Sequence, residues 1–259
     1  MADLREKIAK AADNLSAYPI DVAKLPKNAQ NYAKTIDHTL LKTDATEAQI
    51  DGLCDEARSY DFASVCVRLP WVQRAVQNLR GSPVRVVCVV GFHEGTQATS
   101  DKVSEAANAV KAGASELDMV LNWHQLKDEH YDEVCEDIVA VRKAAPSQVP
   151  LKVILETSQL SRAQIIAGCV IAEAAGAQFL KTSTGFCGQG ATVGNVTLMK
   201  AVVGSRLEVK ASGGIKTSKD CRAMLEAGAS RIGASSGKQI VDEIKGGSSK
   251  PQADGRFMI

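Results

Sequence analysis

Strand-like and helix-like segments alternate along the chain from residue 35 onward, and this alternation limits the fold more than any other feature. We count eight short runs rich in β-branched residues, each followed by a longer segment whose apolar residues recur at helical spacing. The strand-like runs start near residues 35, 63, 85, 115, 151, 178, 206 and 230. Helical stripes, several with Ser or Thr near the start, cover 46–60, 100–112, 132–144, 161–175, 193–203 and 217–227.

A glycine recurs just past the helical segments. The phrases KAGASELDMV, EAAGAQFLKT and LEAGASRIGA each place it two or three residues before a strand-like run. One strand–helix unit repeated eight times predicts an α/β fold, a (β/α)₈ TIM barrel, whose usual length of about 250 residues is close to the 259 residues here. An open doubly wound sheet is the alternative. Such a sheet usually carries a GxGxxG turn after its first strand, and this chain continues into HTLLKTDATEAQ instead.

The pattern divides the chain into three parts. We expect the barrel over residues 35–246, a helical extension over 1–34 and a flexible tail over 247–259, which has the composition of a linker. Apolar residues from Leu4 to Leu15 recur at helical spacing in the extension. We interpret that stripe as a cap on the floor of the barrel or as a contact between subunits.

Charge and composition exclude several classes of protein. The 31 Lys and Arg residues are balanced by 30 Asp and Glu residues, so no basic field favours a nucleic acid or a membrane surface as a partner. Aromatic residues make up 4% of the chain, which leaves few rings for stacking on bases. The chain contains no run of 18 apolar residues, so its sequence predicts no membrane span. The start of the chain resembles neither a signal peptide nor a transit peptide.

The seven cysteines form no CxxC pair and have no histidine at metal-ligand spacing. This pattern predicts neither a zinc site nor a disulfide framework, and it is typical of a reducing compartment. We therefore expect a cytoplasmic protein that acts on a small molecule. If the chain self-associates, we expect a homodimer or a homotetramer.

Alternate residues of the strand-like runs differ in character, as expected if the two faces of each strand meet different surroundings. One face is apolar and suits packing under helices, as at Val65, Leu117 and Val209. The other face would point into the barrel, where an unpaired charge is very costly, so its charged groups must pair with one another. This polar face comprises Asp37, Cys66, Glu116, Asp118, Lys152, Glu156, Lys181, Glu208 and Lys210. These groups either fill the barrel as ion pairs or serve a function. We favour a function for the set, because a polar interior lowers stability in a way that an apolar interior would not.

Two lysines on neighbouring strands indicate the chemistry. Lys181 lies in QFLKTSTGF at the carboxyl side of the sixth strand, and Lys210 lies in LEVKASGG on the seventh. Side chains at equal height on neighbouring strands lie within about 5 Å, and two ammonium groups that close disfavour each other's protonation. One amine is then expected to stay unprotonated near neutral pH and to attack a carbonyl carbon. With Asp118 as proton carrier, the leading hypothesis is Schiff-base chemistry that needs no metal and no other cofactor.

Two loops predict a phosphate site. The sequence SGG at 212–214 follows the seventh strand, and GASSG at 233–237 follows the eighth. Small residues let backbone N–H groups approach an anion at a helix N-terminus, and these two loops are a frequent phosphate site in such barrels. Lys216 either adds a positive charge there or is simply solvated.

Eight segments together resemble the deoxyribose-phosphate aldolases, a family of class I aldolases. They lie in the family's order, and KTSTGF together with VKASGG is the most specific pair. The segments are IDHTLLK at 36–42, VCV at 65–67, VVGFHEG at 89–95, ELDMVLN at 116–122, KVILET at 152–157, FLKTSTGF at 179–186, VKASGGIKT at 209–217 and GASS at 233–236. The resemblance implies a TIM-barrel lyase of deoxyribonucleotide and carbohydrate catabolism, which cleaves 2-deoxyribose 5-phosphate into glyceraldehyde 3-phosphate and acetaldehyde.

By this resemblance Lys181 is the Schiff-base lysine, Lys210 is the lysine that perturbs it, and Asp118 belongs to the proton relay. Asp37 and Cys66 correspond to positions that line the family's substrate pocket. The family's hydroxyl and phosphate contacts correspond to Thr184, Gly185, Gly213, Gly214, Gly233, Ser235 and Ser236.

The chain departs from the family's pattern in three places. Some members end in a tyrosine that assists proton transfer, whereas this chain ends RFMI. Position 186 is Phe where certain members carry Lys, and the family's GFP is GFH at 91–93. Two rival hypotheses stay open: another Schiff-base sugar-phosphate aldolase or transaldolase on the same barrel, and a catalytically silent sugar-phosphate-binding protein.

Overall fold

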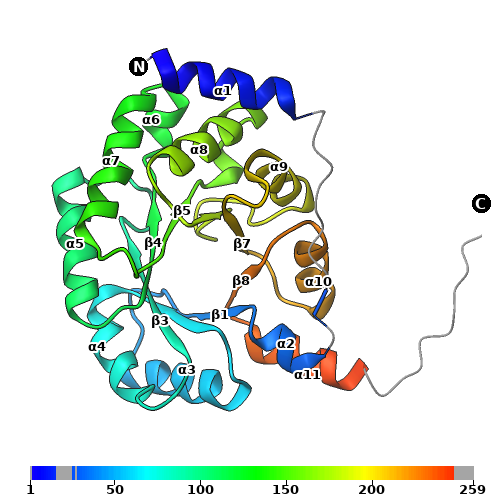
Figure 1. The fold of residues 1–259 in the computed structure, drawn as a ribbon. Coiled ribbons are helices and arrows are strands. Elements are labelled where there is room, and N and C mark those ends of the chain that lie inside the picture. Colours follow the sequence, from blue (N-terminus) through cyan, green and yellow to red (C-terminus); the bar gives the residue numbers. More distant parts are fainter. Residues whose placement is uncertain (1, 16–24, 27, 248–259) are drawn as a thin grey trace, which may run out of the picture.

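The computed structural model describes residues 2–15, 25–26 and 28–247, which form the predicted TIM barrel (Figure 1). Eight parallel strands pair in chain order, and β8 pairs with β1 to close the barrel. The strands are β1 (Ile36–Thr39), β2 (Ser64–Val67), β3 (Arg85–Val90), β4 (Glu116–Val120), β5 (Leu151–Ile154), β6 (Phe179–Lys181), β7 (Glu208–Ser212) and β8 (Arg231–Ala234). Each begins within two residues of its predicted start.

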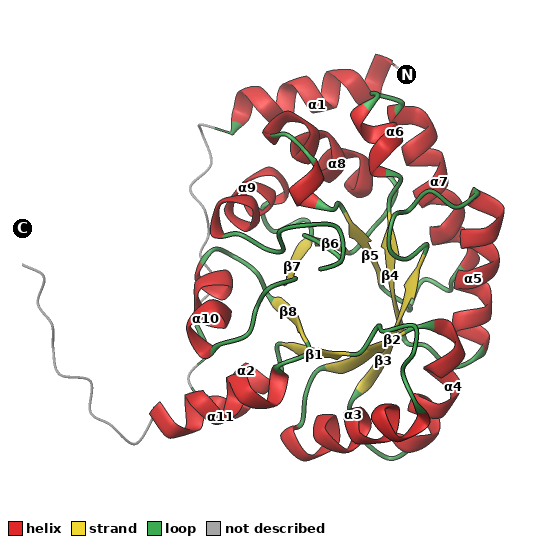
Figure 2. Ribbon diagram, turned by 180° about the vertical axis from the view of Figure 1, so that it is seen from behind, coloured by secondary structure: helices red, strands yellow, loops and turns green. Residues whose placement is uncertain are grey.

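Helices surround the strands as an outer ring (Figure 2). Six of them match the predicted segments: α3 (Glu47–Tyr60), α5 (Thr99–Lys111), α7 (Tyr131–Ala144), α8 (Arg162–Ala174), α9 (Val193–Val203) and α10 (Ser218–Glu226). Local chemistry explains these boundaries. Thr46 and Ser161 form capping boxes with Gln49 and Gln164 at the starts of α3 and α8.

The recurring glycines end helices as predicted. Gly113, Gly176 and Gly228 follow α5, α8 and α10, with φ angles of 101°, 84° and 105°. A residue with a side chain adopts such angles only at a cost in conformational energy, whereas glycine does not. These turns return the chain from the helix ring to the next strand.

Other helices had no individually predicted range, although α2 (Ala29–Ala33) lies inside the helical extension expected over 1–34. They are α2, α4 (Leu69–Asn78), α6 (Trp123–Lys127), the 3₁₀ helix η1 (Thr157–Gln159) and α11 (Gly237–Gly247). At the start of α4 the N-cap residue, Arg68, makes no side-chain cap hydrogen bond. None of the described helices is long and apolar enough to cross a membrane.

The first helix, α1 (Ala2–Asn14), lies against the outside of the helix ring, on α8 and α7 (Figure 1). Leu4 of α1 is buried, and Leu15 just beyond it packs on the same core. The expectation of a cap on the barrel floor is therefore wrong for α1, because its apolar stripe faces neighbouring helices. The tail over 248–259 lies outside the described residues, and the division of the chain at 34/35 and 246/247 stays a prediction.

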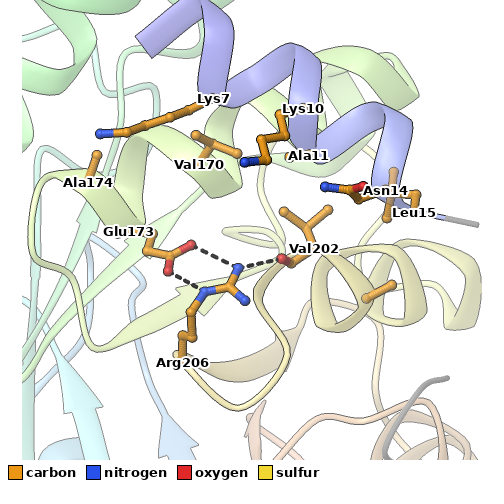
Figure 3. Close-up of a pocket in the computed structure, with 11 residues that line it drawn as sticks. Lys7, Lys10, Ala11, Asn14, Leu15, Val170, Glu173, Ala174, Val202 and Arg206 are labelled. Carbon is orange, nitrogen blue, oxygen red and sulfur yellow. Dashed lines mark hydrogen bonds and ion pairs between the residues drawn. The ribbon is translucent and has the colours of Figure 1, made fainter. Parts of the chain in front are cut away.

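A cavity of about 430 Å³ lies between α1, α8 and α9 (Figure 3). Lys7 and Lys10 of α1 lie along one side, and a Glu173–Arg206 ion pair of 2.5 Å lies on the other. None of the predicted site residues lines it. We therefore look for the active site inside the barrel.

Candidate active site

The barrel interior is polar because the charged face of the strands points inward. Asp37, Asp118, Lys152, Lys181 and Lys210 are all buried, with side chains at most 3% exposed. Register explains their meeting, since the Cα atoms of Lys181 and Lys210 pair across β6 and β7. In the same way Asp118 pairs with Lys152 across β4 and β5. Glu208 is the exception: it lies at the first position of β7 and is exposed, so its assignment to the interior is wrong.

Lys181, Lys210 and Asp118, here called the cavity cluster, form the centre of the site. The Nζ atoms of both lysines lie 2.8 Å from one carboxylate oxygen, Oδ2 of Asp118. The other oxygen accepts a hydrogen bond of 2.8 Å from Lys152. The predicted proximity of the two lysines is therefore confirmed, and a carboxylate lies between them.

The electrostatics of this cluster follow from burial and from neighbouring charges. Burial opposes the charged form of Asp118, but Lys152, Lys181 and Lys210 outweigh it and hold the pKa of the Asp118 carboxyl well below its usual range. Burial also opposes the charge on Lys210, but Asp118 and Asp37 outweigh it and raise the pKa of Lys210. The raised pKa favours the protonated form of Lys210. Of the two lysines, Lys210 is therefore not the one that fits the unprotonated amine expected from the sequence.

Asp37 links the cavity cluster to a second set of charges. It lies 2.5 Å from the Lys210 ammonium and 2.7 Å from Arg231 of β8. Burial opposes its charge, but Lys210 and Arg231 outweigh that effect and lower the pKa of Asp37. The Asp37 side chain is fully buried and does not line the cavity described below.

The second set, here called the inner cluster, consists of Arg85, Glu116, Lys152 and Arg231. Glu116 lies 2.5 Å from Lys152, 2.7 Å from Arg85 and 3.4 Å from Arg231. Sequence reasoning missed Arg85 and Arg231. Arg231 could have been found, because it lies on the same alternation of β8 as the predicted Gly233.

A cavity of about 250 Å³ opens at the carboxyl ends of the strands. Its lining brings together many of the predicted site residues: Lys181, Thr184, Gly185, Gly213, Gly214, Gly233 and Ser235. Cys66 is fully buried and does not line it, and its pKa is raised by burial. Ser236, at the start of α11, is also outside the lining.

Glycines are required where the loops approach one another. A Cβ atom on Gly233 would lie 2.7 Å from Cβ of Ser212 and 3.0 Å from Cε of Lys210, so a side chain there would force Ser212 to shift and would crowd the lysine. The Cα of Gly190 lies only 2.8 Å from the place of a Cβ on Gly213, whose φ of 89° also favours glycine. The small residues of these loops thus keep the floor of the cavity open.

The lining also includes residues outside the predicted substrate-binding set. Two of them are exposed cations at the rim: Lys42, the last residue of the IDHTLLK motif, and Lys216, which the sequence left either as a positive charge near the phosphate or as a solvated side chain. Phe186, whose side chain stays 50% exposed, stacks on His93 with 5.6 Å between ring centroids and meets Phe92 edge-on at 5.2 Å. Phe186 therefore gives the cavity an aromatic lining residue that Phe92 and His93 contact, while the glycine loops present backbone.

This geometry places the chain among TIM-barrel enzymes, because an amine and its carboxylate partner lie at the carboxyl ends of the strands, where catalytic groups of such barrels are found. Comparison with known proteins narrows the class. The sequence profile of the DeoC/LacD family aldolases matches residues 32–243, and the chain belongs to this family. It is accordingly an aldolase, an enzyme of the lyase class.

Two curated relatives illustrate the similarity. The deoxyribose-phosphate aldolase of Coccidioides immitis (strain RS) is 54% identical over 232 residues, which are 88% of this chain and 86% of the relative. That of Staphylococcus epidermidis is 52% identical over 215 residues, which are 83% of this chain and 97% of the relative.

Solved structures agree with this assignment. A crystal structure from Coccidioides immitis matches with a TM-score of 0.88 and 51% identity, over 93% of this chain and 98% of that one. A tetrameric deoxyribose phosphate aldolase from Aeropyrum pernix matches with a TM-score of 0.78 and 27% identity, over 93% and 97% of the two chains.

Proposed function

We propose that this aldolase reversibly cleaves 2-deoxy-D-ribose 5-phosphate to D-glyceraldehyde 3-phosphate and acetaldehyde through a Schiff base on Lys181. One observation carries the proposal. Three lysines contact the carboxylate of Asp118, and Lys181 is the one that lines the cavity. The names of the relatives at 54% and 52% identity support the choice of substrate.

The ion-pair contacts of the buried lysines support Lys181 as the nucleophile. Four buried cations, Lys152, Lys181, Lys210 and Arg231, share three buried carboxylates, Asp37, Glu116 and Asp118. Lys210 contacts two of these carboxylates and Lys152 contacts two, whereas Lys181 contacts only Asp118. Lys181 therefore has the fewest ion-pair contacts of the three lysines, and it faces the cavity, where it can act as the nucleophile.

In the proposed reaction the Lys181 amine attacks C1 of the open-chain aldehyde. Loss of water from the carbinolamine leaves an iminium ion, which is the electron sink. The C3 hydroxyl then gives up its proton through a relay of a water molecule, Asp118 and Lys210, and becomes the aldehyde of glyceraldehyde 3-phosphate. The C2–C3 bond breaks, and its electron pair forms an enamine on Lys181. Protonation at C2 and hydrolysis release acetaldehyde and restore the amine.

The phosphate end of the substrate would lie against the glycine loops. Thr217 caps the N-terminus of α10, and α11 starts at Gly237 directly after the second loop. Two helix N-termini and the cations Lys42 and Lys216 favour a dianion at this rim. Binding energy gained there is remote from the reacting atoms and can be used to orient C1 toward Lys181.

Reductive trapping tests the proposal. Borohydride added with acetaldehyde should fix an ethyl group on Lys181, and intact-mass analysis followed by peptide mapping locates it. Trapping at another lysine would contradict the assignment. The rival hypotheses give different results: a silent sugar-phosphate-binding protein would bind substrate without being trapped, and another aldolase or transaldolase would not use acetaldehyde as the donor in synthesis. Cytoplasmic location and the oligomeric state stay predictions.

A further inference from the structure

Glu156 has a backbone conformation that its residue type seldom adopts. It follows β5 and precedes η1, with φ 58° and ψ 61°, the left-handed region in which glycine is the unstrained choice. Strain of this kind persists where surrounding contacts require it, and it is concentrated at functional sites. The side chain therefore has a use that a glycine could not supply.

The contacts of Glu156 point to the wall of the cavity. Its carboxyl, in a residue only 1% exposed, accepts two hydrogen bonds at Oε2, from the hydroxyl of Thr184 and from the Thr184 N–H at 3.1 Å. The Thr184 oxygen in turn accepts a hydrogen bond of 3.1 Å from the N–H of Phe186. Thr184, Gly185 and Phe186 all line the cavity that Lys181 faces.

This chain of hydrogen bonds changes the expected role of Thr184. A threonine hydroxyl has one proton to donate, and Thr184 donates it to Glu156. The hydroxyl is thus committed to the protein and is not a free donor to a phosphate or a sugar. We propose that Glu156 is a positioning residue of this aldolase, which holds Thr184 and with it the cavity wall from Thr184 to Phe186. The inference rests on the function proposed above.

The surroundings of Glu156 suit a role that depends on hydrogen bonding rather than on charge. Burial raises the pKa of its carboxyl, although the Thr184 hydrogen bonds and the charges of Lys181 and His93 oppose this. Its Oε1 atom is buried without a hydrogen-bond partner among the described residues. A glutamine at this position keeps an oxygen that can accept both hydrogen bonds from Thr184, so it should preserve the positioning.

Three variants at position 156 and its partner test the proposal. Glu156→Gly removes the side chain and relaxes the backbone, so the protein should stay folded, with kcat/KM lowered by about 10- to 100-fold because the wall is misplaced. Glu156→Gln should retain most of the activity and the pH profile of the wild type. Glu129→Gly is the matched control, since Glu129 also has a positive φ, 59°, but is exposed and pairs with Arg5 outside the site. It should leave kcat/KM unchanged.

A double-mutant cycle shows whether Glu156 acts through Thr184. Thr184→Val should lower kcat/KM by a similar factor, and Glu156→Gly combined with Thr184→Val should be no worse than either single variant. Independent, additive losses would overturn the proposal. So would a Glu156→Gln enzyme that loses activity together with one limb of its pH profile, because the carboxyl would then act as an acid or base itself.

Amide hydrogen exchange provides a readout that does not need activity. Protection at the amides of Thr184 and Phe186 should fall in Glu156→Gly and persist in Glu156→Gln. Unchanged protection in Glu156→Gly would overturn the proposal even if the enzyme acts on another substrate. The two proposals can fail separately. If the wild type neither cleaves deoxyribose 5-phosphate nor traps acetaldehyde on Lys181, the proposed function is contradicted. If Glu156→Gly still shows the loss of protection in that case, the positioning role remains supported.

Discussion

The inner cluster and the cavity cluster contain the same kinds of charged groups, but they differ in neutralisation and in access. In the inner cluster, Lys152 lies between two carboxylates, at 2.5 Å from Glu116 and 2.8 Å from Asp118, and no part of its side chain is exposed. In the cavity cluster, Lys181 shares one carboxylate oxygen with Lys210 and faces open space. Two buried lysines of one barrel therefore differ in their contacts. Under the proposed function, Lys152 stabilises the fold and Lys181 is the nucleophile.

Substituting methionine for each of the two lysines in turn tests this comparison, and the largest effect is expected at Lys181. Lys181→Met removes the proposed nucleophile, so we expect kcat to fall by at least about 10⁴-fold, in line with the loss of a covalent catalyst. Its thermal stability should fall less than that of Lys152→Met, because Lys181 contacts one buried carboxylate and Lys152 contacts two. Steady-state assays and calorimetry measure the two effects. Residual activity near the wild-type level would exclude Lys181 as the Schiff-base lysine.

Lys152→Met should have its main effect on stability. It leaves Glu116 and Asp118 buried with fewer positive charges, and removing one partner of a buried ion pair typically costs about 3–5 kcal/mol. Denaturant unfolding measures this loss as a lower midpoint. If Lys152→Met and Lys181→Met were equally stable, the contrast between the two clusters would be wrong.

Acid unfolding should sharpen the contrast. The pKa of Asp118 is lowered in the folded state from its ordinary 3.8, so its contribution to stability is present above about pH 4 and is lost as the pH falls further, through the folded pKa. Lys152 lowers this pKa more than Lys181 does. Both methionine variants should therefore unfold at a higher pH than the wild type, and Lys152→Met at the higher of the two. Circular dichroism during acid titration would show the reverse order if the assignment were wrong.

The smallest effect is expected at the exposed rim. Lys216→Ala or Lys42→Ala should raise KM for the phosphorylated sugar by about fivefold, since an exposed charge pair contributes at most about 1 kcal/mol. KM for unphosphorylated deoxyribose should not change, and added salt should reduce the difference between variant and wild type. Equal effects on both sugars would mean that these lysines do not meet the phosphate.

Particular residues show how far the sequence could predict this site. Lys181, Lys210 and Asp118 could be selected because they interrupt β-branched strands on the inward alternation, and pairing of neighbouring strands brings them together. Glu208 satisfied the same alternation and was wrongly placed inside, because a strand's first residue can extend beyond the barrel wall. The Glu156–Thr184 contact could not be predicted, since it depends on a left-handed turn after β5 that nothing in KVILETS indicates.

Strand and helix periodicity, the capping residues and the glycines that follow helices are local properties, and they were sufficient to predict a barrel of eight units with reactive lysines inside it. The distribution of charge among those groups is not local. Lys210 has its pKa raised by Asp37 and Asp118, which come from β1 and β4 on other sides of the barrel. Only closure of the barrel determines which lysine shares which carboxylate and which amine faces the cavity, because electrostatic energies in a buried site depend on distances of a few ångströms between residues far apart in the chain.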